Sequence, residues 1–245
     1  MSKKSLSFIL FAALLTLVYV SCKKADEVPA PLGPTSKYYP LERGKYVIYN
    51  VDSTKWDDTF CVAIKRAYQI MHTVADTFTD NKGRLSYRIN TRIRKKATDP
   101  WEVQDVIYVT NTGATLEMAY ANLRFIKLTF PVKQGNTWKG NSLIPTADPD
   151  FAYFDDWDYT YDRANVPYST GEVQYENAVE VSHVDRAVNS PDVFPNDPAS
   201  RTFSREVYAP NVGMVYREYV RWTYDPQTTK CRKGTGVIMR AVDHN

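Results

Sequence analysis

The sequence predicts an all-β domain, mainly antiparallel, in the form of a strongly curved sheet or barrel. Aromatic residues make up 13% of the chain, with 18 tyrosines among them, and such side chains favour strands. Apolar and polar residues alternate over many short segments separated by turn signals, without the longer strand–helix–strand spacing of a parallel sheet. We therefore expect one β domain, with room for a short helix in the concavity of its sheet.

The clearest strand covers residues 85–94, LSYRINTRIR. Its odd-numbered positions are mostly apolar and predict a core face, whereas its even-numbered positions form a cationic stripe that includes Arg88, Arg92 and Arg94. We expect acids on a neighbouring strand to pair with this stripe. Contact with phosphate or an anionic lipid is the alternative.

The preceding segment, Phe60 to Phe78, places its apolar residues on one parity and predicts a strand with a core face. Asp80–Gly83 then predicts a hairpin turn, Asn111–Gly113 a second tight turn, and the proline-rich Asn189–Ser200 an exposed loop. Further strands are expected at Lys45–Ser53, Val103–Asn111, Asn122–Phe130, Glu172–Val184, Ser204–Ala209, Met214–Tyr224 and Gly236–Val242.

The N-terminus predicts export. Lys3 and Lys4 precede an apolar run, Leu6–Val20, of 15 residues. A spanning helix needs about 20 such residues, so the run is better suited to a signal-peptide core. We expect residues 1–21 to be a cleaved signal peptide, residues 22–37 a lipidated cysteine with a flexible tether, and residues 38–245 a single β domain.

The apolar run ends at Ser21-Cys22-Lys23-Lys24, which resembles the lipobox of bacterial lipoproteins. The resemblance implies that Cys22 becomes the first mature residue and carries the acyl chains that anchor the protein to the membrane. Tyr19 departs from the aliphatic residue usual in that family, and an ordinary secretory signal is the alternative. Asp26 and Glu27 loosely resemble an acidic surface-export signal, so both faces of the outer membrane, periplasmic and external, stay open.

Most of the mature chain is similar to a group of uncharacterised Bacteroidota envelope lipoproteins. The resembling segments are Tyr39-Pro40-Leu41 with Gly44, Tyr46 and Tyr49; Asp80–Arg88; Arg124–Pro131 with Gly135, Trp138 and Gly140-Asn141; and Gly213–Tyr216. The resemblance implies an envelope location and the β fold, and it implies no activity. A remoter similarity, of architecture alone, is to acyl-chain carriers of the lipoprotein-chaperone type.

Charge and motifs argue against several function classes. The formal charge of +3 falls to +1 once Lys3 and Lys4 are removed, which gives no support to nucleic acid as a partner. No nucleophile elbow, phosphate loop or dinucleotide motif occurs, so no catalytic residue and no cofactor is assigned. His72, His183 and His244 lack the spacing of metal ligands, so no metal site is predicted, and the first two are expected in the interior.

Cys61 and Cys231 form the one cysteine pair available besides Cys22. In an oxidising compartment they are candidates for a disulfide between an early strand and the C-terminal region. Two separate thiols are the alternative, because a bond requires the two Cα atoms to lie close together.

Residues 148–162, DPDFAYFDDWDYTYD, have the most distinctive local composition. Aromatic faces can stack on sugar rings while carboxylates hold hydroxyl groups, and clustered carboxylates can bind calcium. The candidate ligand-binding residues are Asp156, Trp157, Asp158, Tyr159 and Tyr161. The same alternation is expected of a strand with one packed and one solvated acidic face.

The leading functional hypothesis is a non-enzymatic envelope lipoprotein whose β domain binds a ligand, such as a glycan, or another envelope protein. A glycan-acting hydrolase is one alternative, and it requires a cleft with two carboxylates about 5–10 Å apart. A lipid carrier is another, and it requires a deep apolar pocket.

Overall fold

A computed structural model describes residues 37–245, which form one twelve-stranded antiparallel sheet, nearly closed like a barrel. The predicted fold class is confirmed. The strands are β1 (Tyr46–Asp57), β2 (Val62–Thr79), β3 (Leu85–Arg94), β4 (Glu102–Asn111), β5 (Thr115–Tyr120), β6 (Leu123–Thr129), β7 (Thr137–Trp138), β8 (Tyr159–Ser169), β9 (Gln174–Val188), β10 (Ala199–Ala209), β11 (Gly213–Tyr224) and β12 (Arg232–His244). In place of the short helix, the β7–β8 connection contains the three-residue 3-10 helix η2 (Ala152–Phe154).

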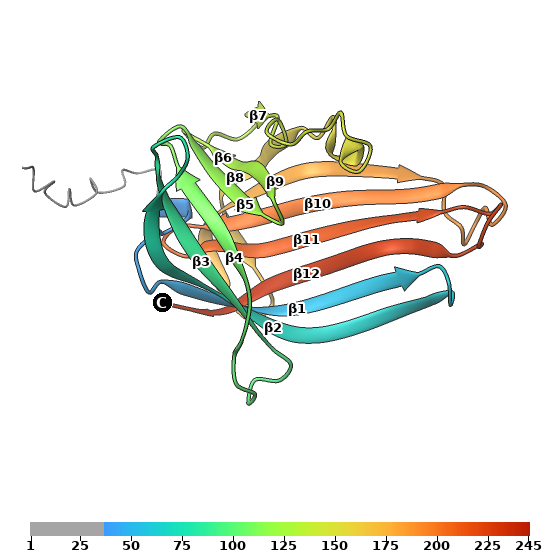
Figure 1. Cartoon of the computed structure of the whole chain (residues 1–245), viewed down its shortest axis with the longest axis horizontal. Helices are drawn as coiled ribbons and strands as arrows, with labels where there is room; N and C mark the ends of the chain where they lie inside the picture. Colours follow the sequence, from blue (N-terminus) through green and yellow to red (C-terminus); the bar gives the residue numbers. More distant parts are fainter. Residues whose placement is uncertain (1–36) are drawn as a thin grey trace, which may run out of the picture. The chain divides into compact units, whose positions relative to one another are not determined.

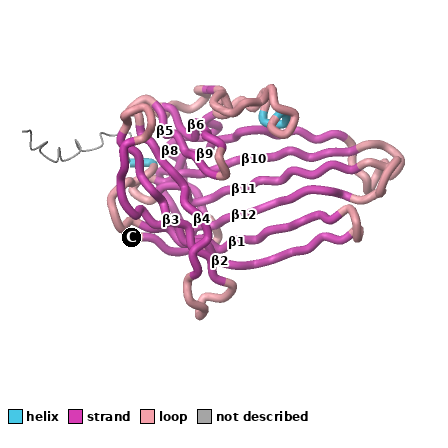
Figure 2. Tube along the Cα trace, viewed as in Figure 1, coloured by secondary structure: helices cyan, strands magenta, loops and turns pink. Residues whose placement is uncertain are grey.

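The strand order is β6-β5-β4-β3-β2-β1-β12-β11-β10-β9-β8-β7. Two meanders of hairpins, β1–β6 and β7–β12, therefore meet where the first strand pairs with the last (Figure 1). Figure 2 shows that strands account for most of this region and that loops gather at the strand ends. Within residues 37–245 no helix is long and apolar enough to span a membrane.

A few isolated hydrogen bonds, from side chains and from the backbone, join the two ends of the sheet, where β6 approaches β7 and β8. The Ile126 N–H donates to the Gly140 carbonyl at 2.8 Å, and Trp138 Nε1 donates to the Ile126 carbonyl at 2.8 Å. The Tyr161 hydroxyl donates to the Thr129 carbonyl at 2.6 Å and accepts from the Thr129 N–H at 3.0 Å. The curved sheet thus encloses its interior without a continuous ladder at this seam.

A large apolar cluster fills the interior. Its fully buried members include Tyr49, Val51, Ile89, Leu116, Leu128, Val181 and Tyr208. Buried tyrosines need partners for their hydroxyl groups, and Tyr49 satisfies this by donating to the Met214 carbonyl at 2.8 Å. The expected core face of β3 is confirmed, since Tyr87 and Ile89 are buried.

The expectation for Phe60–Phe78 is wrong in two places. Phe60, Val62 and Ile64 are exposed, because the first part of β2 extends beyond the point where β3 begins to pair with it, at Gln69. Further along, the register shifts between Val74 and Asp76. Such a bulge reverses the face of every later residue, which moves Phe78 from the core side to the outer face.

Most of the other expected strands and turns match the structure within a few residues. Neither β5 nor the two-residue β7 is among the expected strands, and a strand at β8 is one of several alternatives for the acidic–aromatic segment. The expected signal peptide, Cys22 and nearly all of the tether lie outside the described residues.

Candidate functional site: a cationic cleft with aromatic walls

The strand register collects polar side chains on the outer face of the sheet formed by β2 to β6. Residues directly opposite each other on neighbouring strands share a face. Asp76 pairs with Arg88, Arg88 with Tyr108, Tyr108 with Ala119, and Ala119 with Arg124, which gives one row across five strands. This row lies on the side opposite the buried β3 residues, and it brings Arg88 and Arg124 to one surface.

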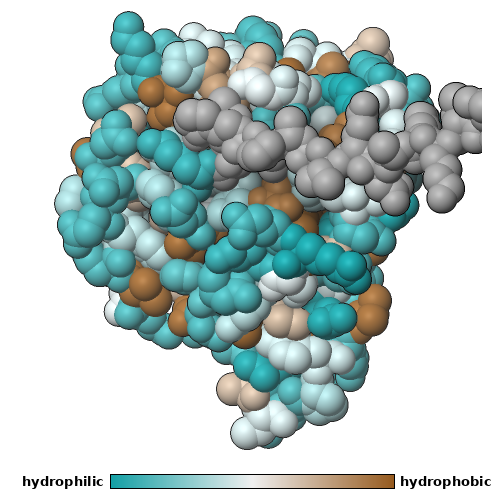
Figure 3. Space-filling view, turned by 90° about the vertical axis from the view of Figure 1, so that its left-hand side faces the viewer, coloured by the Kyte–Doolittle hydropathy of each residue, from teal (hydrophilic) through white to brown (hydrophobic). Residues whose placement is uncertain are grey.

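A cleft of about 460 Å³ opens beside this row, within the size range of small-molecule sites. Four cationic residues contribute to its wall, together with two aromatic residues. Its lining residues are Phe78, Asp80, Asn81, Lys82, Arg84, Arg88, Tyr108 and Arg124. Figure 3 looks onto the end of the sheet at the left of Figure 1, and hydrophilic residues cover most of that surface.

The β2–β3 turn forms one rim of the cleft. Asp80 Oδ1 accepts hydrogen bonds from the backbone N–H groups of Lys82 and Arg84, each at 2.9 Å, and Gly83 adopts the positive φ of 74° that the turn requires. Arg84 Nε donates to Asp80 Oδ2 at 2.9 Å. Because the Arg84 backbone and side chain both bond to it, the pKa of Asp80 falls to about 2.

Two of the arginines that line the cleft share one buried carboxylate. Glu117 is buried, and its two oxygens accept from Arg84 Nη1 at 2.9 Å and from Arg124 Nη1 at 2.8 Å. Burial raises the pKa of Glu117, but the hydrogen bonds and charges of the two arginines outweigh burial and lower it. Both carboxylates of the site are therefore ionised at neutral pH, and both hold arginine side chains in place.

Arg88 and Arg124 line the cleft and have guanidinium donors beyond those in their hydrogen bonds to neighbouring residues. A guanidinium carries five N–H donors, and among the described residues the hydrogen bonds of Arg124 go through Nη1 to Glu117 and Thr110, and that of Arg88 through Nη1 to Asp76. Nε and Nη2 of each side chain are thus available for a carboxylate or a phosphate.

Phe78 and Tyr108 form the apolar part of the wall. Their rings meet edge to face at 5.5 Å, and the Arg88 guanidinium lies 4.5 Å from the centre of the Phe78 ring. Tyr108 is 40% exposed, so its ring can pack against a ligand. The cleft therefore combines anion-binding donors with an apolar surface.

A second polar cluster lies inside the sheet. Lys127 Nζ is 2.7 Å from Glu206 Oε1, and Tyr208 donates to Glu206 Oε2 at 2.6 Å. Arg217 Nε lies 3.7 Å from Glu206 Oε1. The positive charges of Lys127 and Arg217 outweigh burial and keep the pKa of Glu206 low. The side chains of Lys127 and Glu206 are only 3% and 1% exposed, so this cluster lies in the interior of the fold.

His183 belongs to the same cluster. Its ring stacks on Tyr159 with a centroid distance of 3.9 Å, and Nδ1 bonds to Ser204 Oγ at 2.9 Å. Burial lowers the pKa of His183 to about 3, although Glu206 opposes this shift. The histidine is therefore neutral at physiological pH. Both His183 and His72 lie on the interior side, as expected, and burial lowers the pKa of His72 to about 4.

The aromatic members of the acidic–aromatic candidates are buried in the domain, whereas the acidic members are exposed to solvent. Trp157, Tyr159 and Tyr161 are 3%, 1% and 0% exposed, and their rings pack inside the domain against Phe154, His183 and Trp138, respectively. Asp156 and Asp158 are exposed, and Asp158 forms an ion pair with Lys139 at 2.9 Å. The three rings are thus unavailable for stacking on a ligand.

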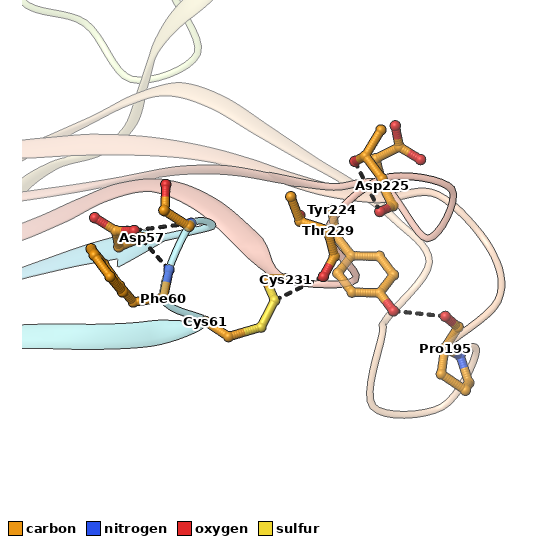
Figure 4. Close-up of a disulfide and its surroundings, with 10 residues drawn as sticks. Asp57, Phe60, Cys61, Pro195, Tyr224, Asp225, Thr229 and Cys231 are labelled. Atoms are coloured by element: carbon orange, nitrogen blue, oxygen red, sulfur yellow. Dashed lines mark hydrogen bonds between the residues drawn. A yellow bond between two sulfur atoms is a disulfide. The ribbon is translucent and has the colours of Figure 1, made fainter.

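Cys61 and Cys231 are joined by a disulfide, with Cα atoms 5.3 Å apart. Figure 4 shows how the bond links the β1–β2 connection to the β11–β12 connection. Nearby, the Tyr224 hydroxyl donates to the Pro195 carbonyl at 2.7 Å. The disulfide therefore ties together the ends of the β1–β2 and β11–β12 hairpins.

A smaller cavity, of about 30 Å³, is lined mainly by apolar residues such as Val74, Ile89 and Met214. That volume holds about one or two water molecules, so it is too small for an acyl chain. No group of histidines, cysteines and acids that could hold a metal ion occurs between residues 37 and 245.

No family model matches the sequence, and no curated protein does. Among solved structures, the chain is similar to a protein from Bacteroides fragilis NCTC 9343 that is inferred to be exported and has a YmcC-like fold. The two share 9% identity over 84% of this chain and 97% of the other, with a TM-score of 0.45. The functional assignment therefore depends on the residues of this chain.

Proposed function

We propose that this protein is a non-enzymatic binding protein of the bacterial envelope, and that its cleft at β2–β6 holds an anionic ligand. The ligand carries a carboxylate or phosphate group next to a flat apolar surface such as a sugar ring. The observation that supports this most directly is the pair Arg88 and Arg124, which share one cross-strand row and border a cleft of about 460 Å³.

The arginines are organised before a ligand arrives. Glu117 holds Arg84 and Arg124, and the stack on Phe78 holds Arg88. Because the side chains are already fixed, a ligand loses less free energy to ordering them on binding. The nearby acids leave a small excess of positive charge, which favours a singly or doubly charged anion.

Binding explains this cleft better than glycoside hydrolysis does. Hydrolysis requires one carboxylic acid that is protonated near neutral pH, usually through a raised pKa. The pKa values of Asp80 and Glu117 are instead lowered by their arginine partners. The lipid-carrier alternative receives no support from the cavity near Ile89, which is too small for an acyl chain.

The envelope location in this proposal comes from the N-terminal sequence. The basic residues, the apolar run and Cys22 in its lipobox-like setting support export and a lipid anchor in the outer membrane. Whether the cleft then faces the periplasm or the exterior determines which anions it meets. In this proposal the protein associates with the membrane through its N-terminal lipid.

Calorimetry with three probes tests the cleft. An oligogalacturonide supplies carboxylates on sugar rings, a neutral galacto-oligosaccharide lacks the charge, and phosphatidylglycerol vesicles supply an anionic lipid headgroup. We expect the oligogalacturonide to bind, more weakly as the salt concentration rises, and the neutral sugar not to bind. Preference for the vesicles would identify a lipid source for the same anionic chemistry.

Arg88→Ala and Arg201→Ala form a matched pair of variants. Both arginines pair with an exposed aspartate and stack on a phenylalanine, Phe78 and Phe203 respectively, but only Arg88 lines the cleft. Loss of a charge-assisted contact in Arg88→Ala should weaken binding about tenfold or more, with no change in Arg201→Ala. Equal effects in the two variants, or equal binding of charged and neutral sugars, would contradict the proposal.

A further inference from the structure

The first part of β2, Val62–Tyr68, is a sheet edge with one side open. β1 pairs with it along its whole length, from Asp57 opposite Val62 onward. β3 pairs with β2 only from Gln69, opposite Arg94, and in the part of the chain that the structure describes no other strand reaches the remaining edge. In Figures 1 and 2 this stretch of β2 is the outermost strand, with nothing beside it between the β3–β4 loop and the β1–β2 connection.

An open edge presents unpaired backbone N–H and C=O groups that can pair with another strand. All residues from Cys61 to Ala67 are exposed. Val62 is 46% and Ile64 39% exposed, and they share one face with Arg66, while Lys65 lies on the other. The edge therefore offers both a backbone ladder and alternate apolar side chains.

The disulfide keeps this edge in place. Cys61 is the residue directly before β2, and its bond to Cys231 ties the end of the edge to the β11–β12 connection. A strand end that is covalently held frays less, so the edge loses less conformational entropy when a partner strand pairs with it.

Charges around the edge favour an acidic partner. Lys65 and Arg66 project from the edge itself, and Lys95 and Lys96 follow β3 where its pairing with β2 stops. Self-pairing is disfavoured, because an antiparallel pair of two Val62–Tyr68 edges centred on Lys65 places lysine opposite lysine, and like charges directly opposite each other are destabilising.

We propose that the open edge of β2 over Val62–Tyr68 is a docking site for an extended acidic segment of a partner protein, which pairs with it as an additional strand. Apolar residues of that segment pack on Val62 and Ile64. Its carboxylates on the opposite face meet Lys65, and a carboxylate next to its apolar residues meets Arg66. This site is separate from the cleft and does not depend on the anionic ligand proposed above.

Hydrogen exchange and fluorescence anisotropy on the full chain test this site. The probe is a synthetic peptide of alternating valine and glutamate, with one further glutamate at the valine position opposite Arg66. The comparison peptides replace glutamate by lysine or carry N-methyl groups that remove alternate backbone donors. We expect the glutamate peptide to bind and to slow exchange at backbone amides within residues 62–68. The lysine and N-methyl peptides should bind at least about tenfold more weakly.

Charge reversal provides the second arm. In Lys65→Glu/Arg66→Glu the preference should switch from the glutamate peptide to the lysine peptide, which a merely structural role of these residues does not predict. Arg43→Glu/Lys133→Glu, at exposed positions outside the edge, and Arg88→Ala in the cleft should leave peptide binding unchanged. Binding without protection of residues 62–68, equal binding of the N-methyl peptide, or dimerisation of the protein through this edge would overturn the proposal.

Discussion

The ammonium group of Lys127 lies 2.7 Å from the carboxylate of Glu206, and the two side chains are only 3% and 1% exposed. Lys127 is on β6 and Glu206 on β10, strands that are far apart in the sheet order. The ion pair therefore crosses the interior and connects the two meanders from within, behind the seam that Trp138 and Tyr161 bridge.

Removing one partner of this pair should destabilise the protein strongly. Lys127→Met leaves the Glu206 carboxylate buried without its main partner, and we expect the free energy of unfolding to fall by about 3–5 kcal/mol. Urea denaturation measures the change. Lys139→Met is the control, because its partner Asp158 is exposed and water screens such a surface pair, so we expect little change in stability. A Lys127→Met/Glu206→Leu protein that is less stable than Lys127→Met would contradict this account.

Mild acid should destabilise the protein through His183. Its pKa is about 3 in the folded protein and about 6.5 in the unfolded chain. Between these values only the unfolded chain binds the proton, so the free energy of unfolding falls as pH decreases below about 6.5, by up to about 1.4 kcal/mol per pH unit. His72 acts in the same direction.

Unfolding free energies at several pH values between about 5 and 7.5 test this effect, in a range above most carboxylate titration. His183→Asn should flatten the dependence on pH, whatever it does to absolute stability. An unchanged slope in His183→Asn would show that this histidine does not carry the effect.

The disulfide should contribute to stability. Cys61 and Cys231 are 170 residues apart in the sequence, and in the chain-entropy model closing so long a loop contributes up to about 5 kcal/mol. Cys61→Ser/Cys231→Ser should unfold at lower urea concentration than the native protein. Reductant should destabilise the native protein and leave the double variant unaffected; equal sensitivity of both would rule out this role.

The seam between β6 and β8 should weaken when the Tyr161 hydroxyl is removed. Tyr161→Phe leaves the Thr129 N–H and C=O without this partner. Thr129 is half-buried, so we expect a loss of about 1 kcal/mol, at the lower end for unpaired groups. Native-state hydrogen exchange should show faster exchange at the Thr129 amide. Tyr46→Phe is the control, since the Tyr46 hydroxyl bonds to exposed Asp243; a similar loss of stability in both variants would argue against a special role of the seam.

Cys22 should determine membrane attachment. Because the proposed anchor is attached to its sulfur, Cys22→Ala should move the protein from the membrane fraction to the soluble fraction and abolish labelling by a palmitate analogue. Protease accessibility on intact cells, with a periplasmic protein as leakage control, then reports which side the β domain faces. Membrane attachment that survives Cys22→Ala would refute the lipoprotein assignment.

The fold class was accessible from the sequence because alternation is a local property. Residues 85–94 alone indicate which side of β3 is buried and which is cationic, and Asp80–Gly83 marks the turn. The two-residue β7 is too short to leave a periodic signal. The bulge before Asp76 is invisible to simple parity, so Phe78 was placed on the wrong face.

The candidate cleft was only partly accessible. Arg88 was recognised as part of a cationic face, but its neighbours Tyr108 and Arg124 join it only through the register of β3, β4, β5 and β6. Register depends on turns and bulges distributed over some fifty residues, which no local pattern specifies. The acidic–aromatic segment is distinctive in composition, but the rings of Trp157, Tyr159 and Tyr161 are buried.

The pairing of β1 with β12 makes the chain suitable for circular permutation. Asn245 Oδ1 accepts a hydrogen bond from the Tyr46 N–H at 2.8 Å, so the end of the last strand lies beside the start of the first. A short linker between them, with new termini opened in the connection between β6 and β7, yields a circular permutant. In that order β7 becomes the first strand and β6 the last, and β1 and β12 become an ordinary hairpin.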